Sequence, residues 1–187
     1  MGERLLIGVS ACLLGERVRY DGRDKRDPWI CARLADRFDL EPICPEVAIG
    51  LGVPRPPIRL VAEAPGTRAQ RVDEPAVDVT EALAAYAGEV AQRLGGVLAG
   101  YVFKSRSPSC GTGGVPRFSP AGEPAGDSAG IFAAALRARL PGLPVAEEAE
   151  LSTPGGRLNF VARVEAYARE RKTDGAGPTQ GRAGVAE

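Results

Sequence analysis

The sequence predicts an α/β protein with a mostly parallel sheet that has helices on both of its faces. Segments 5–9 and 97–103 are continuous apolar runs, which is the pattern of strands buried on both sides. Segments with helical periodicity follow both runs, and strands that alternate with helices of this length form parallel sheets. The length of 187 residues suits one domain, which we assign to residues 1–172.

The first half of the chain is expected to contain one helix and a second strand after the strand at 5–9. Pro28 suits the first turn of a helix, and apolar residues recur every four positions from Ile30 to Phe38. Residues 40–43 form a short strand candidate, which Pro42 weakens because proline cannot donate a ladder hydrogen bond.

The second half is expected to contain three helices and two strands, the first of which is the run at 97–103. Thr80 can cap a helix, and two further helices are expected at 130–140 and 158–171, with a last strand at 143–145 between them. The helix after Thr80 has one apolar face, formed by Leu83, Tyr86, Ala87, Val90 and Leu94. Residues 173–187 have no periodicity and few apolar side chains, so we expect a disordered tail there.

The composition excludes several classes of function. The chain has no histidine, which removes Ser–His and Cys–His nucleophile pairs, histidine bases and histidine-containing zinc sites. A net charge of zero argues against broad, sequence-independent binding of nucleic acid. No apolar run is long enough to cross a membrane, and the first residues lead into a strand and not into a signal peptide. We therefore expect a cytoplasmic protein without a membrane span, in which cysteines more often bind metals or react than form disulfides.

Three of the four cysteines follow strands of the predicted sheet. Cys12 and Cys44 come shortly after the first two strands, and Cys110 follows the strand at 97–103. Loops after parallel strands converge on one edge of a sheet, so these thiols could meet in space. The chain has no Cys-x-x-Cys pair, whereas three thiolates without histidine suit a soft metal or an iron–sulfur cluster. Spacing alone is equally compatible with buried small hydrophobes, and Cys31, inside the first helix, is expected to pack in the core.

The residues around these cysteines form a set of motifs in a fixed order. The set consists of Ser-Ala-Cys-Leu-Leu-Gly at 10–15, Val-Arg-Tyr-Asp-Gly at 18–22, Cys-Pro-Glu at 44–46, Pro-Arg-Pro at 54–56 and Lys-Ser-Arg-Ser-Pro-Ser-Cys-Gly at 104–111. From about residue 5 to about residue 148 the chain resembles the TudS-type thiouracil desulfurase family. Segments 143–148 and 159–167 are similar to the form found in longer thiouridine desulfidases, which carry an additional C-terminal domain.

The resemblance implies a Rossmann-like domain that holds a [4Fe-4S] cluster at the C-terminal edge of its strands. The ligands it implies are Cys12, Cys44 and Cys110. An iron without a protein ligand would bind the sulfur of a thiolated pyrimidine as a soft Lewis acid. Catalytic roles fall on Glu46, which would activate water and return a proton, and on Ser107, which would contact the pyrimidine or relay a proton. The products would be uracil or uridine and hydrosulfide.

Substrate contacts are implied for two neighbours of these residues, Ser109 and Lys104. Each role has a structural alternative. Both serines could bond backbone groups in a turn, Lys104 could be a solvated charge at a strand end, and Glu46 could cap the next turn.

Two other functions remain open from the sequence. The first is a non-catalytic module that binds an iron–sulfur cluster or zinc. The second is an action on tRNA, either as removal of sulfur from thiouridine or as an RNA-binding module whose basic segments 17–26 and 55–59 face the thiolated tRNA. The neutral net charge favours a small-molecule thiopyrimidine over tRNA as the partner, and the sequence does not predict an oligomeric state.

Overall fold

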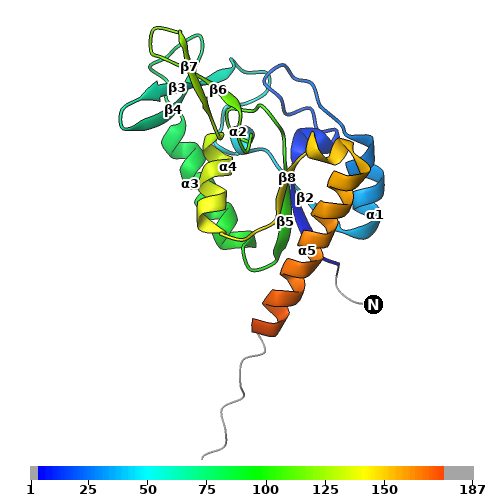
Figure 1. The fold of residues 1–187 in the computed structure, drawn as a ribbon. Helices are drawn as coiled ribbons and strands as arrows, with labels where there is room; N and C mark the ends of the chain where they lie inside the picture. Colours follow the sequence, from blue (N-terminus) through cyan, green and yellow to red (C-terminus); the bar gives the residue numbers. More distant parts are fainter. Residues whose placement is uncertain (1–3, 175–187) are drawn as a thin grey trace, which may run out of the picture.

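The computed structural model describes residues 4–174 and shows an α/β fold built on a parallel sheet (Figure 1). The strand order of this first sheet is β2-β1-β5-β8, and every neighbouring pair is parallel. Its strands are β1 (Leu6–Ser10), β2 (Asp39–Ile43), β5 (Leu98–Phe103) and β8 (Val145–Glu147). The fold class predicted from the sequence is therefore confirmed.

Helices cover both faces of this sheet, and each face has its own core (Figure 1). On one face α3 (Thr80–Leu94) and α4 (Ile131–Arg139) pack on the aromatic side chains of β5. On the other face lie η2 (Ile30–Leu34), α1 (Ala35–Arg37) and α5 (Pro154–Asp174). All six residues of β5 are buried, as expected for a central strand between two helical layers.

The predicted strands agree with the structure to within about two residues. Pro42 is tolerated because β2 lies at the edge of the sheet and pairs only with β1, where Pro42 faces Val9. The last strand begins at Val145, two residues later than expected, although the carbonyl of Pro144 already accepts a hydrogen bond from the amide of Tyr101.

The first predicted helix, which follows Pro28, differs from expectation in two details. The helix after Pro28 contains a π-helical turn over Ile30–Leu34. Cys31 is only partly buried and belongs to none of the described core clusters, so its prediction as a core residue is wrong. Ile30 and Leu34 occupy the buried face of the helix. Cys31, the residue after Ile30, lies off that face, and its Sγ is 3.5 Å from the carbonyl oxygen of Leu13.

The predicted cap at Thr80 is also wrong, although α3 itself begins there. The hydroxyl of Thr80 accepts a hydrogen bond from the amide of Ala69 at 2.7 Å, and Asp78 accepts from the amide of Thr80 at 2.9 Å. The long helix α5 starts at Pro154, before the predicted 158, and continues to Asp174. The first two residues of the expected tail are therefore helical, and its remainder, 175–187, lies outside the described residues.

A second sheet, which the sequence did not predict, lies above α3 in Figure 1. Its order is β4-β3-β6-β7, with two antiparallel hairpins joined by a parallel pair between β3 and β6. Its strands are β3 (Ile58–Glu63), β4 (Gly66–Arg71), β6 (Val115–Phe118) and β7 (Pro124–Ser128). A third core cluster fastens this sheet to the start of α3 through Leu60, Val115 and Leu83. Within residues 4–174 no helix is both long enough and apolar enough to cross a lipid bilayer.

Candidate functional site

Three cysteines line one cavity at the C-terminal edge of the parallel sheet. Cys12 lies in η1 (Ala11–Leu14), directly after β1, and Cys44 precedes α2 (Pro45–Ala48), directly after β2. Cys110 lies in the connection that follows β5. All three contribute to a cavity of about 320 Å³, which is small but within the usual range for small-ligand sites. The meeting of these loops, inferred from the sequence, is thus what the structure shows.

The thiols of these cysteines are free; Cys12 and Cys110 are buried, whereas Cys44 is only partly buried. Burial, followed by the nearby Cys44, raises the pKa of the Cys12 thiol to about 11. Burial also raises the pKa of Cys44, and that of Cys110 lies well above its ordinary value despite a hydrogen bond from Ser10 that lowers it. The charges of Cys12 and Cys44 raise the pKa of Cys110 further, so the three thiols lie within electrostatic reach of one another.

The arrangement of donors bears on which metal the site could take. Across residues 4–174 no group of three or more His, Cys, Asp or Glu side chains is gathered tightly enough to hold a single metal ion. A zinc ion draws its ligands onto one atom. A [4Fe-4S] cluster instead places each thiolate on a different iron, so its ligands are spread more widely. The donor set therefore fits a cluster better than a single zinc ion.

Glu46 lies in the first turn of α2 and is fixed by two hydrogen-bonding partners. Its Oε2 receives hydrogen bonds from the Arg55 guanidinium at 2.8 Å, and its Oε1 accepts a hydrogen bond from the hydroxyl of Ser109 at 2.8 Å. The exposed fraction of the side chain is 13% for Glu46 and 4% for Arg55. Both residues line the cavity, so an ionic group and its counter-charge stand beside the cysteines.

Arg55 connects the loops that carry the cysteines. Its Nη1 donates to the carbonyl of Val18 at 3.0 Å and to that of Gly52 at 2.8 Å. Val18 follows the Cys12 turn, whereas Gly52 follows the Cys44 helix. From the sequence Arg55 belonged to a motif and to the basic segment 55–59, and its buried contact with Glu46 was missed because no local pattern indicates which carboxylate an arginine meets.

Ser107 and Ser109, the two serines with predicted roles in the motif at 104–111, have different surroundings. Ser107 lines the cavity, and its Oγ accepts hydrogen bonds from the amides of Ser109 at 3.3 Å and Cys110 at 3.1 Å. These contacts match the turn alternative, yet they leave the hydroxyl proton of Ser107 free to be donated. Ser109 is fully buried, donates to Glu46 and is not among the residues that line the cavity. The geometry gives Ser109 the task of holding Glu46 in place of the expected substrate contact.

Lys104 lines the cavity, but its ammonium group is engaged by protein. Nζ pairs with Glu148 and also donates to the carbonyl and hydroxyl oxygens of Ser105, each at 3.0 Å. Burial alone would raise the pKa of Glu148, but the hydrogen bonds from Lys104 and Ser105 outweigh it, and the pKa is lowered. Three acceptors match the three ammonium protons, so the geometry does not favour the expected contact between Lys104 and the substrate. Lys104 instead links the ends of β5 and β8.

The rim of the cavity is basic and carries one exposed aromatic ring. Arg19, Lys25 and Arg106 contribute to the lining, together with Tyr20. The Arg19 guanidinium lies 5.3 Å from the centre of the Tyr20 ring and pairs with Asp21 at 3.2 Å. These side chains could contact the outer part of a ligand, and Arg19 and Lys25 belong to the basic segment 17–26 that was considered for contact with RNA.

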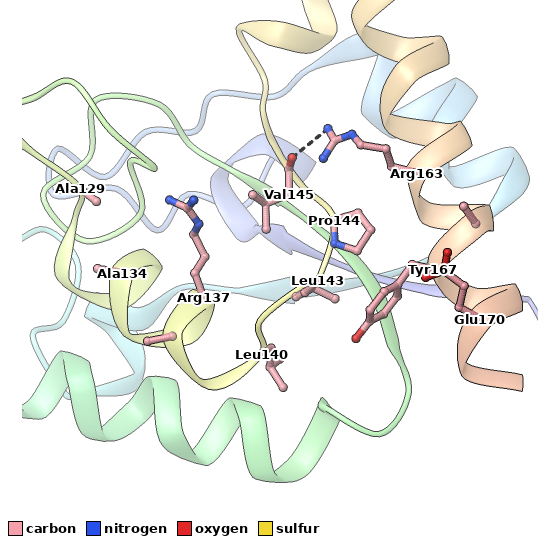
Figure 2. Close-up of a pocket in the computed structure, with 13 residues that line it drawn as sticks. Ala129, Ala134, Arg137, Leu140, Leu143, Pro144, Val145, Arg163, Tyr167 and Glu170 are labelled. Carbon is pink, nitrogen blue, oxygen red and sulfur yellow. Dashed lines mark hydrogen bonds between the residues drawn. The ribbon is translucent and has the colours of Figure 1, made fainter. Parts of the chain in front are cut away.

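A larger groove of about 720 Å³ lies elsewhere, between α4 and α5 (Figure 2). Its lining includes Arg137, Arg163 and Tyr167 but no cysteine and none of the predicted catalytic residues. Arg163 covers the outer edge of β8 there by donating to the carbonyl of Val145 at 3.0 Å, the dashed contact in Figure 2. We therefore place the candidate active site at the smaller cavity.

Comparison with known proteins agrees with this assignment. A family model described as 2-thiouracil desulfurase matches residues 7–148, which include the three cavity cysteines. A solved structure of a [4Fe-4S]-dependent thiouracil desulfidase, TudS, is 31% identical and superposes with a TM-score of 0.61. That match covers 86% of this chain and 99% of the other. No curated protein matches the sequence. The chain belongs to the 2-thiouracil desulfurase family.

Proposed function

We propose that this protein is a [4Fe-4S]-dependent desulfidase that converts a thiolated pyrimidine, such as 2-thiouracil, to the oxo-pyrimidine and hydrosulfide. The observation that carries the proposal is the cavity in which three free cysteines lie beside the fixed carboxylate of Glu46. The solved relative with the same fold is itself a [4Fe-4S]-dependent thiouracil desulfidase. The overall reaction is a hydrolysis, in which water supplies the new oxygen and no net oxidation or reduction takes place.

Cys12, Cys44 and Cys110 would hold the cluster, because they are the cysteines that line the cavity. When bound, the cluster supplies a soft Lewis acid whose iron without a cysteine ligand can take the substrate's sulfur. Burial raises the pKa of all three thiols and so favours their neutral form before loading, and binding of the cluster must displace their protons.

Glu46 is the residue we assign as general base. Each carboxylate oxygen has two lone-pair positions, and Arg55 and Ser109 approach different oxygens of the group. Lone pairs therefore remain for a water molecule in the cavity, from which Glu46 takes a proton as the water attacks the thiocarbonyl carbon. The proton can afterwards be returned to the departing sulfur or to a ring nitrogen.

The remaining residues orient the reacting groups. Ser107 can donate its hydroxyl proton to the pyrimidine, since its two backbone contacts use only the oxygen lone pairs. Arg55 balances the charge of Glu46, and Ser109 fixes the direction of the carboxylate. Lys104 acts on the shape of the site through its link to Glu148.

The test is to reconstitute the full chain anaerobically and to measure iron, acid-labile sulfide and the loss of thiocarbonyl absorbance from 2-thiouracil. We expect a bound cluster, release of hydrosulfide and formation of uracil. A chain that takes up no cluster would overturn the proposal, and a loaded chain without turnover would identify a non-catalytic cluster-binding module.

Replacement of the base gives a sharper test of the mechanism. Glu46→Gln should keep the cluster but lose activity by about 10²- to 10⁴-fold, the usual contribution of a general base. Glu63→Gln, at the exposed end of β3, is the matched control and should keep full activity. Unchanged turnover in Glu46→Gln would remove this residue from the mechanism.

A further inference from the structure

The segment 104–112 carries three residues of the proposed site but forms neither a helix nor a strand. Ser107, Ser109 and Cys110 lie in it, between the end of β5 and the start of β6. A site built on an irregular loop is less precise than one on a regular element unless other contacts hold the loop. The contacts that fix this segment therefore decide how precisely the site is formed.

Two consecutive glutamates at the end of β8 hold the two ends of this segment. Oε1 of Glu147 accepts hydrogen bonds from the amide of Thr112 at 2.6 Å and from its hydroxyl at 3.0 Å. Oε2 of Glu148 accepts from the amide of Ser105 at 2.7 Å, and its Oε1 accepts from the Ser105 hydroxyl at 2.6 Å. The amide of Glu148 still bonds to the carbonyl of Phe103, so the ladder with β5 continues to this residue. Successive side chains along a strand point in opposite directions, so the two neighbours reach opposite ends of the segment.

The middle of the segment is held by backbone groups of α4. The amide of Ile131 donates to the carbonyl of Pro108 at 3.0 Å. The amide of Ala133 donates to the carbonyl of Ser109, also at 3.0 Å. These bonds do not depend on which side chains α4 carries, whereas the contacts of both glutamates do depend on their carboxylates.

The residues that carry the proposed chemistry lie between the two held ends. Ser109 donates to the carboxylate of Glu46 at 2.8 Å, and the next residue, Cys110, lines the cavity. The amide of Cys110 is in turn held by the hydroxyl of Ser107 at 3.1 Å. A shift at either end would therefore move a cluster ligand and the partner of the general base together.

We propose that Glu147 and Glu148 act together to hold the segment 104–112 in its cluster-binding shape before the cluster is present. A loop that already has its bound shape loses less conformational entropy on binding, so the cluster is held more tightly. This inference rests on the proposed function, and it assigns both glutamates as positioning residues. They act through Cys110 and Ser109 and do not contact the substrate.

Amide hydrogen exchange of the cluster-free chain, resolved by residue with NMR, tests the inference without an activity assay. Glu147→Ala should speed exchange by about 10- to 100-fold at Thr112, which loses its charged acceptor. It should also speed exchange at Ser105, although the acceptor of that amide, Glu148, is unchanged. Glu147→Gln keeps an oxygen that can accept both bonds and should restore the protection. Glu63→Ala, at the exposed end of β3, is the matched control and should exchange like the wild type.

The loaded protein gives a second readout in the rate at which iron passes to a chelator. Wild type, Glu147→Ala, Glu148→Ala and the double variant are reconstituted anaerobically and mixed with an excess of bathophenanthroline disulfonate. Each single variant should release iron faster than the wild type, because the loop that carries Cys110 is no longer held. The double variant should release iron about as fast as the faster single variant, since opening either end frees the segment, whereas the effects of independent contacts would multiply.

Two results would overturn the inference and leave the desulfidase intact. One is faster exchange in Glu147→Ala at Thr112 alone or uniformly along the whole chain, since neither matches a segment that is held at both ends. The other is a wild-type rate of iron release in both single variants. If Glu147→Ala does not fold, Thr112→Val removes only the hydroxyl contact and should speed exchange in the segment by a smaller factor.

Failure of the proposed function would look different. A wild-type chain that never binds a cluster would overturn the desulfidase, while the exchange experiment on the cluster-free chain would still decide whether the two glutamates hold the segment.

Discussion

At the scale of single residues, the ion pair between Glu46 and Arg55 connects the proposed general base to two loops of the cavity. Both side chains are largely shielded from water, and Arg55 also holds the carbonyls of Val18 and Gly52. Each partner is tolerable at this depth only because the other compensates its charge. The pair therefore fixes the position of the Glu46 carboxylate, and it ties together the segments that follow two of the cysteines.

Removing the arginine should consequently destabilise the protein before any substrate is present. Arg55→Met leaves the Glu46 carboxylate buried without its counter-charge, and the expected loss in the free energy of unfolding is about 3 kcal/mol. Urea denaturation of the chain without cluster measures it. Arg37→Met, which breaks the exposed pair with Glu165, is the control and should have little effect. Equal losses of unfolding free energy in the two variants would show that the Glu46–Arg55 pair stabilises the protein no more than an exposed ion pair does.

Three of the four cysteines should bind the cluster, and the fourth, Cys31, should not. Cys12→Ser, Cys44→Ser and Cys110→Ser should each lose most of the cluster, because serine is a poor ligand for iron in such clusters. Cys31→Ser should retain it, since Cys31 lies outside the cavity and its thiol donates to the carbonyl of Leu13. Iron and acid-labile sulfide per chain are the measurements. A cluster lost equally from Cys31→Ser would contradict the assignment.

At the scale of elements, the link between the ends of β5 and β8 should make stability depend on pH. The pKa of Glu148 is lowered in the folded state, so its interaction with Lys104 contributes stability above the ordinary glutamate pKa of about 4.3. That contribution is lost as the pH falls through the lowered folded-state value. Glu148→Gln should therefore be less stable than the wild type at neutral pH, and the difference should shrink in acid.

Denaturation of the wild type and of Glu148→Gln at several pH values between neutrality and strong acid tests this. Glu165→Gln, which alters an exposed pair, is the control and should show a much weaker dependence on pH. A difference for Glu148→Gln that stays constant down to strong acid would rule out titration of this carboxylate.

The elements also show which parts of the fold can be predicted from sequence. The buried parallel strands were identified because β1 and β5 are continuous apolar runs between two helical layers. The second sheet was missed because its strands are rich in arginine, glycine and proline, as in Gly66–Arg71 and Pro124–Ser128. Cross-strand pairing and a small shared core with α3 hold these strands, and neither leaves a periodic signal in the sequence.

The same distinction applies to the candidate site. The gathering of the cysteines followed from topology, because loops after parallel strands meet at one edge. The partners of Glu46 did not follow, since Ser109 is 63 positions away along the chain and meets it only through packing of the loops. The ion pair between Lys104 and Glu148, which is 44 positions away, could not be predicted from the sequence either. Topology can thus place residues at an edge, while their partners depend on tertiary contacts.

At the scale of the whole molecule, charge and cavity size point to a small substrate. The chain has 24 basic and 24 acidic residues, so it lacks the net positive charge that draws proteins to polynucleotides. The cavity of about 320 Å³ lies at the lower end of the range for small-molecule sites. The basic rim formed by Arg19, Lys25 and Arg106 is local, and it could act on the outer part of a small ligand as well as on a phosphate backbone.

We therefore expect free 2-thiouracil to be a better substrate than thiolated tRNA, and its turnover to change little between low and high salt. The physical reason is that a neutral base releases no counterions on binding, whereas tRNA binding would weaken steeply as salt increases. Assays of 2-thiouracil, 4-thiouridine and thiolated tRNA side by side at two salt concentrations make the comparison. Faster and salt-sensitive desulfuration of tRNA would contradict this expectation and would assign the basic rim to contact with RNA phosphates. Substitution of Arg106, the exposed rim residue with a left-handed backbone, would then weaken tRNA turnover while sparing the free base.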